Sequence, residues 1–257
     1  MRVAVIGLGE AGFLYAEGLG ASGQDVTGYD PVAHPALDNV AVAPTVGECV
    51  EGAEVVFSLV GAANADRVVT DLLPHLLPGM VLADLNTSGP EEKRRMARRV
   101  VEVGASYLDV AVLAPVPRAG AGTPLMISGD GGDTLRLALQ GTGAHIETVG
   151  GGAGAAAERK LLRSVFMKGL AGVVIEALEG AKSADCEDWL RGQIETELVG
   201  DPVQLVERLV TGSQAHAERR KHEAEDAARC LEELGTPSWM IRGAGEWFGE
   251  LEKRSTG

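Results

Sequence analysis

A glycine-rich segment near the N-terminus, GLGEAG at residues 7–12, constrains the fold of this chain more than any other stretch. It follows an apolar run at residues 3–6 and precedes a stretch whose apolar residues have helical spacing. In that context each glycine has its own role: Gly7 permits a tight turn, Gly9 leaves the backbone uncovered, and Gly12 lets the helix pack closely on the strand. The segment predicts a strand–turn–helix unit, although a glycine-rich turn without a ligand is the simpler interpretation.

An acidic residue supports a ligand at this turn. Asp30 ends a second predicted strand, residues 24–29. Where such a turn binds a dinucleotide, the helix N-terminus holds the pyrophosphate, and an acid roughly 20 residues further on binds the ribose 2′-hydroxyl. The other interpretation of Asp30 is a residue that opens a turn with Pro31. Strand, glycine turn, helix, second strand and acidic residue follow one another in the order that a dinucleotide site requires. The predicted site is formed by Gly7, Leu8, Gly9, Glu10, Ala11, Gly12 and Asp30.

Asp30 also bears on which dinucleotide binds. A carboxylate at this position would repel a 2′-phosphate, and no arginine or lysine directly follows it to hold one. The sequence therefore favours NAD over NADP.

Strand and helix patterns alternate through the first part of the chain. Strand-like runs are predicted at 54–60, 80–84, 107–112, 125–128 and 145–149, with helices at 66–77 and 90–104. Alternation with short connections predicts an α/β fold with a parallel, doubly wound sheet of the Rossmann type. The basic residues of the second helix are interpreted as a solvated face; they are Lys93, Arg94, Arg95, Arg98 and Arg99.

The pattern changes after the glycines at 150–154, because no strand candidate remains beyond them. Helices are predicted at 155–181 and 185–198, then one long helix from the Asp201-Pro202 pair to Gly235, and a last one from Thr236. We therefore predict two domains: a dinucleotide-binding Rossmann domain at residues 1–154 and an all-α domain for substrate binding and dimerisation at residues 155–257.

Composition excludes several classes of partner. The net charge of −14 argues against binding to nucleic acid or to an anionic membrane. An odd count of three cysteines suits a reducing compartment, and a strand that begins near residue 2 leaves no room for a signal peptide. No apolar run reaches the length of a membrane span, and the spacing of histidines and acids predicts no metal site. The expectation is a cytoplasmic enzyme with a small-molecule substrate.

Three further segments resemble one known family. The turn DLNTSGP at 84–90 is similar to its D-x-S-T-x-x-P motif, and GAAAERK at 154–160 is similar to its catalytic-lysine segment. Residues 216–223 and 234–237 resemble a helical domain of unknown function found in one of its branches. With the glycine turn, they make nearly the whole chain resemble the β-hydroxyacid dehydrogenases, which include 3-hydroxyisobutyrate and 6-phosphogluconate dehydrogenases. The resemblance implies cofactor contacts at Val60, Asn64, Asn86 and Thr87.

The resemblance also implies a nicotinamide-dependent oxidoreductase acting on a hydroxy acid or related alcohol, with Lys160 as its acid/base. Lys160 is flanked by apolar residues at the start of a helix, where partial desolvation favours proton exchange; a lysine with its amine in solvent is the competing interpretation. Ser164 stands where the family has an asparagine and is predicted to contact the substrate hydroxyl. Arg163 is a candidate for a substrate anion, with a surface position favoured.

The substrate loop departs from the family pattern D-x-P-V-S-G-G, because the chain reads DVAVLAP at 109–115. The serine and glycines that grip a carboxylate are missing; the corresponding substrate positions are Leu113, Ala114 and Pro115. This stretch also resembles the loop of imine reductases, which share the fold. A second hypothesis is therefore an imine reductase, and a third is a non-catalytic NAD-binding sensor. Lys160 argues against both the imine reductase and the sensor, and Asp30 argues against the imine reductase.

The helix predicted from residue 155 carries apolar residues on more than one side, among them Leu161, Val165 and Val173. Such a helix is expected to be sandwiched rather than laid on a surface. In the family that the chain resembles, these helices pack against a second subunit. The sequence therefore predicts a homodimer built through the C-terminal helices.

Overall fold

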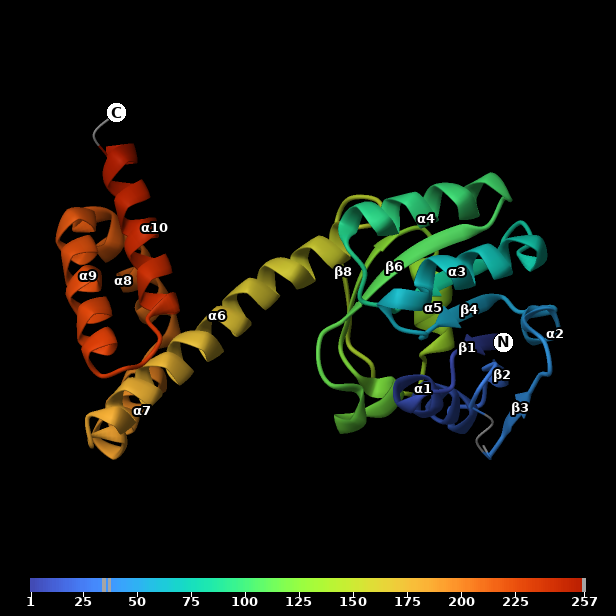
Figure 1. Ribbon diagram of the computed structural model, residues 1–257. Coiled ribbons are helices and arrows are strands. Elements are labelled where there is room, and N and C mark those ends of the chain that lie inside the picture. The colour runs from blue at the N-terminus through green and yellow to red at the C-terminus, as the bar shows by residue number, and fades with distance from the viewer. Residues whose placement is uncertain (34–35, 37, 256–257) are drawn as a thin grey trace. The chain divides into compact units, whose positions relative to one another are not determined.

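The computed structural model describes residues 1–33, 36 and 38–255 (Figure 1). The chain divides into two compact units, Met1–Arg163 and Ser164–Gly257, here called unit 1 and unit 2. Helix α6 (Ala155–Ser183) contributes its first two turns to unit 1 and the rest to unit 2.

Unit 1 is built on a single eight-stranded sheet in the order β3-β2-β1-β4-β5-β6-β7-β8. The strands are β1 (Arg2–Ile6), β2 (Asp25–Tyr29), β3 (Val40–Val42), β4 (Val55–Ser58), β5 (Val81–Asp84), β6 (Ser106–Val112), β7 (Leu125–Gly129) and β8 (Ile146–Thr148). The predicted α/β, Rossmann-type, doubly wound architecture is confirmed. Because the strand order reverses between β1 and β4, the carboxyl ends of these two strands form the switch point at which such sheets bind ligands.

One strand corrects the prediction of a fully parallel sheet, because β7 pairs antiparallel to β6 while the other neighbours are parallel. The segment between β6 and β7 contains two short 3₁₀ turns, Val116–Arg118 and Gly120–Gly122, and no crossover helix. A parallel connection requires such a crossover, so a chain that returns directly must run antiparallel.

The two faces of the sheet carry separate cores, and alternation along β1 shows why. Val3 and Val5 face a cluster that includes α1 (Glu10–Ala21) and α5 (Gly132–Ala138). Ala4 and Ile6 face the opposite cluster, which includes α2 (Val46–Val50), α3 (Ala62–Leu72) and α4 (Pro90–Glu102). Successive strand residues point to opposite faces, so a continuous apolar strand supplies both cores.

Some short elements were not predicted, and one predicted helix is displaced. β3, α2 and α5 have at most seven residues each, too few for a clear period. α3 begins at Ala62 and ends at Leu72, and a 3₁₀ turn, Leu73–His75, follows it. Pro74 lies within that turn and has no N–H for a helical hydrogen bond, so the helix predicted at 66–77 ends early.

Unit 2 is all-helical, as predicted, and comprises the remainder of α6 with α7 (Glu187–Val199), α8 (Pro202–Ala215), α9 (Ala217–Glu233) and α10 (Trp239–Ser255). Asp201 caps α8, because its Oδ1 accepts hydrogen bonds from the N–H groups of Val203 and Gln204 at 2.8 and 3.3 Å. Glu176 of α6 accepts from the N–H groups at the start of α10, which ties these two helices together.

The single helix predicted from residue 201 to Gly235 is wrong, because His216 interrupts it. The backbone of His216 leaves helical geometry, with φ −130° and ψ 35°, and separates α8 from α9. Neither glycine nor proline lies between Ser213 and Arg219, so no sequence signal marked the break.

Candidate active site

The glycine turn between β1 and α1 has the geometry that a dinucleotide requires. Gly7 has a φ of +93°, and a Cβ there would lie 2.5 Å from the carbonyl oxygen of Leu59. A Cβ on Gly12 would lie 1.8 Å from the carbonyl oxygen of Gly7, so only glycine permits this approach of helix to turn. A Cβ on Gly9, in contrast, would meet no neighbouring residue within 4 Å. The turn therefore fits a pyrophosphate over Gly9, before the N-terminus of α1.

Asp30 lies beside this turn at the end of β2. Its Oδ2 accepts a hydrogen bond from the N–H of Leu8 at 2.8 Å. Its Oδ1 accepts from the N–H groups of Val32 and Ala33 at 2.8 and 2.9 Å. The turn-opening role is therefore present, and the same carboxylate is held at the glycine turn, where a ribose hydroxyl is expected.

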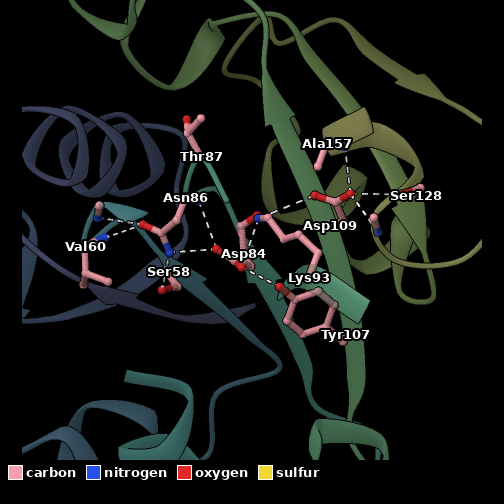
Figure 2. Close-up of polar contacts among 12 residues, drawn as sticks. Ser58, Val60, Asp84, Asn86, Thr87, Lys93, Tyr107, Asp109, Ser128 and Ala157 are labelled. Carbon is pink, nitrogen blue, oxygen red and sulfur yellow. Dashed lines mark hydrogen bonds and ion pairs between the residues drawn. The ribbon is translucent and has the colours of Figure 1, made fainter. Parts of the chain in front are cut away.

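Asn86 connects the ends of β4 and β5 (Figure 2). Its Oδ1 accepts from the N–H groups of Val60 and Gly61 at 2.7 and 2.8 Å. Its Nδ2 donates to Ser58 Oγ at 3.0 Å and to Asp84 Oδ1 at 2.7 Å. An amide side chain has two donor hydrogens and two acceptor lone pairs, so these bonds saturate it. Asn86 therefore shapes the loop that begins at Val60 rather than offering its amide to a ligand.

Lys160 and Thr87, far apart in sequence, meet at this edge of the sheet. Lys160 Nζ donates to Thr87 Oγ1 at 3.1 Å, and the lysine is half-buried while Thr87 is exposed. A cavity of about 10 Å³ lies beside them, lined also by Ser88 and Leu161, which is space for roughly one water molecule. The structure thus brings together two residues that the sequence implicated separately.

The other predicted residues lie in several places. Asn64 is exposed in the first turn of α3, and its Nδ2 donates to the carbonyl oxygen of Val60 at 3.4 Å. Ser164 belongs to unit 2 and accepts a hydrogen bond from Lys168 Nζ at 2.7 Å. The substrate candidates, all in unit 1, do not line the cavity beside Lys160; they are Leu113, Ala114, Pro115 and the exposed Arg163.

One interpretation is wrong: Lys93 is not part of a solvated face. Its side chain is 1% exposed, and its Nζ lies 2.9 Å from Asp84 Oδ2 and 3.5 Å from Asp109 Oδ1 (Figure 2). It also donates to the backbone carbonyl of Asp84 at 2.8 Å. The period of α4 carried the signal, because Lys93 shares the buried face with Met96 and Val100, three and seven residues further on.

The two aspartates of this buried cluster hold different elements. Asp109 Oδ2 accepts from the N–H groups of Gly154 and Ala157 at 3.0 and 2.9 Å, so Asp109 of β6 caps the start of α6. Asp84 accepts from the hydroxyl of Tyr107. Burial, reinforced by the charge of Asp84, raises the pKa of Tyr107 well above its usual range, which keeps the phenol a donor.

Ser128 of β7 adds a further tie to α6. Its Oγ accepts from the N–H of Ala156 at 2.9 Å and donates to Asp109 Oδ2 at 3.3 Å. The first turn of α6 is therefore held by side chains from two neighbouring strands.

Other features of the described residues lie apart from the predicted site residues. A groove of about 550 Å³ lies along α9 and α10, and it contains none of the predicted site residues. Among residues 1–33, 36 and 38–255, no group of three or more His, Cys, Asp or Glu side chains is arranged to hold a metal ion. Within the same residues, every helix is too short or too polar to cross a membrane.

Comparison with known families bears on both parts of the chain. Residues 2–151 match the NAD binding domain of 6-phosphogluconate dehydrogenase, and residues 181–251 match a domain of unknown function (DUF1932). The 2-hydroxy-3-oxopropionate reductase of Escherichia coli is 30% identical over 161 residues, which cover 59% of this chain and 55% of that protein. The matches span between 46% and 67% of the curated relatives' own lengths.

Solved structures extend the likeness over nearly the whole chain. A conserved hypothetical protein from Sinorhizobium meliloti is 29% identical, with a TM-score of 0.66 over 97% of this chain and 87% of that one. An imine reductase from Streptomyces aurantiacus has the same fold, with a TM-score of 0.80 at 22% identity over 97% and 94% of the two chains. The resemblance predicted from the motifs is confirmed. The chain belongs to the β-hydroxyacid dehydrogenase family with the NAD-binding domain of 6-phosphogluconate dehydrogenase, in the branch that carries this helical domain of unknown function.

Proposed function

We propose that the protein is an NAD-dependent oxidoreductase that oxidises a hydroxy acid or related alcohol, or reduces the matching carbonyl, with Lys160 as acid/base. The observation that carries the proposal is the hydrogen bond from Lys160 Nζ to Thr87 Oγ1, at the sheet edge that also bears the glycine turn. The family relationship supports oxidoreductase chemistry. The hydroxy-acid substrate rests on the resemblance and on the lysine.

The residues present fit this chemistry. Gly9 and the N-terminus of α1 would hold the pyrophosphate, and Asp30 would hold the ribose. A bound nicotinamide supplies hydride transfer. Lys160 would accept the proton of the substrate hydroxyl in oxidation and return it in reduction. Thr87 would orient the lysine amine through the hydrogen bond between them.

A substrate panel tests the proposal. The full chain would be incubated with hydroxy acids or cyclic imines and with each nicotinamide cofactor, while cofactor absorbance is followed. Turnover of hydroxy acids supports the proposal, and turnover of imines alone would favour the imine reductase instead. Binding of NAD without turnover of any compound would favour the sensor. The missing serine and glycines at 113–115 are the observation that keeps the alternatives open.

We expect tighter binding of NAD than of NADP. Replacing Asp30 with alanine should narrow the difference, because the change removes both the ribose hydrogen bonds and the repulsion of a 2′-phosphate. Asp25→Ala is the matched control, since it removes an exposed acid from the other end of β2. Dissociation constants for both cofactors would be measured by fluorescence titration for the three proteins. Tighter binding of NADP to the unmodified protein would contradict the assignment.

We infer that two copies associate through the helices of unit 2, because these helices expose many large apolar side chains, and gathered apolar surface marks interaction sites. The exposed side chains are Val165, Phe166, Met167, Val173, Ile175, Trp189, Leu198, Val199, Val203, Val206, Leu209, Val210, Trp239 and Trp247. A cytoplasmic location stays a prediction from cysteine usage.

Sedimentation would test the dimer. The unmodified chain should sediment as a dimer at micromolar concentration, and Val165→Glu/Phe166→Glu should sediment as a monomer, because two charges cannot be buried in an apolar interface. Val32→Glu is the control, since Val32 is 84% exposed in unit 1. A monomeric unmodified chain would refute the assembly.

A further inference from the structure

We propose that Lys93 is a positioning residue that holds the Asn86–Thr87 turn and the first turn of α6 together, and thereby keeps Lys160 beside Thr87. The inference rests on the proposed role of Lys160. It assigns a function to a buried cation that the sequence placed on the surface.

The position of Lys93 explains how two buried carboxylates coexist. Asp84 and Asp109 are register partners on β5 and β6, so their side chains leave the same face of the sheet. Both are essentially inaccessible, at 1% and 0% exposure. Like charges at paired positions destabilise a sheet, and a buried charge requires a partner. The ammonium group of Lys93 is that partner, since it lies within ion-pair distance of both carboxylates.

Each carboxylate then holds one of the two segments that bear Thr87 and Lys160. Asp84 Oδ1 accepts from the backbone N–H of Asn86 at 2.9 Å and from its amide, which fixes the turn that ends in Thr87. Asp109 Oδ2 accepts from Gly154 and Ala157, and this fixes the start of the helix that bears Lys160. A negative charge at a helix N-terminus is stabilised by the helix dipole, so the tie is charge-assisted.

The segment that bears Thr87 and the segment that bears Lys160 are joined by this cluster and by the Lys160–Thr87 hydrogen bond itself. Lys160 lies three residues after Ala157, almost one turn further along α6. A shift of Asp109 relative to Asp84 therefore moves Lys160 relative to Thr87. Lys93 joins the two carboxylates by a route that includes neither Lys160 nor Thr87, so it can set their separation before any ligand binds.

A labelling experiment tests this without a substrate. Lysine amines of the full chain would be acetylated with trace isotopic acetic anhydride over a range of pH, and each site would be quantified by mass spectrometry. Exposed Lys182 on the same helix is the internal reference. In Lys93→Met, the labelling of Lys160 relative to Lys182 should rise several-fold, and its pH profile should approach that of Lys182. Arg99→Met is the matched control on α4, because Arg99 pairs with Asp66 and Thr70 instead.

The control variant should leave the Lys160 profile unchanged. A folded Lys93→Met protein with a wild-type Lys160 profile would overturn the proposal, since a purely structural lysine would alter the unfolding temperature alone. If circular dichroism shows that Lys93→Met does not fold, Asp109→Asn decides the matter. Its amide oxygen can still accept from Gly154 and Ala157, but the charge that pairs with Lys93 is gone. The same change in labelling, smaller in size, supports the proposal, and an unchanged profile refutes it.

This result is separable from the proposed function. A changed Lys160 profile in Lys93→Met, together with full turnover in Lys160→Ala, would keep the positioning role and reject the acid/base role.

Discussion

Replacing Lys160 with alanine is expected to lower turnover by roughly 10²–10⁴-fold, the usual contribution of a general acid/base. The affinity for NAD should stay within a few-fold, because the phosphates and the ribose are proposed to bind at Gly9 and Asp30, at other points of the sheet edge. Lys160→Arg should restore little activity, since a guanidinium does not lose its proton at working pH. Initial rates at saturating cofactor, with a substrate found in the panel, would measure the effect.

The control for this prediction is Lys182→Ala, which removes an exposed lysine in the last turn of α6. It should leave turnover near that of the unmodified protein. Near-full turnover in Lys160→Ala would mean that the proton passes through another group. The imine reductase or the non-catalytic sensor would then become the better hypothesis.

Two alanine substitutions in the glycine turn should separate cofactor binding from folding. Gly9→Ala should lower NAD affinity on the order of 10–100-fold, because its methyl group occupies the space next to backbone N–H groups that bind a charged phosphate. Its effect on unfolding should be about 1 kcal/mol or less, since Gly9 has a φ of −65° and no neighbour within 4 Å to resist a methyl group. Gly12→Ala should lower NAD affinity by a similar factor. It should also lower the free energy of unfolding by about 1–3 kcal/mol, because α1 must move away from the turn.

Urea unfolding and titration with NADH fluorescence would measure both quantities for the two variants. Wild-type affinity in Gly9→Ala would show that no pyrophosphate lies over this position. Equal stability of the two variants would contradict the close approach of Gly12 to Gly7.

The parts that could be predicted from sequence are those set by local chemistry. The turn around Gly7 needs a positive φ, and buried runs such as residues 55–57 are apolar throughout, so both are visible in the chain itself. The order of these parts along the chain then identified the family. The role of Lys160 stays a prediction of the same kind, because it rests on the likeness of its segment to a family motif.

The parts that could not be predicted depend on contacts between distant residues. The spacing of Lys93 with Met96 and Val100 predicts a buried face of α4, but the partners of Lys93 become visible only when β5 and β6 place two carboxylates beneath that helix. The direction of β7 depends on the path of a loop with no strong period of its own. The break at His216 has no glycine or proline within three residues on either side to mark it.

The saturated amide of Asn86 has a consequence for the chemical durability of the protein. Asparagine side chains in turns age by deamidation, in which the backbone nitrogen of the next residue attacks the amide carbon. For Asn86 that reaction would require the amide to rotate toward the nitrogen of Thr87 and give up its four hydrogen bonds. The residue would then become a carboxylate facing Asp84. The hydrogen bonds that shape the loop at Val60 should therefore also protect Asn86 from deamidation over the lifetime of the molecule.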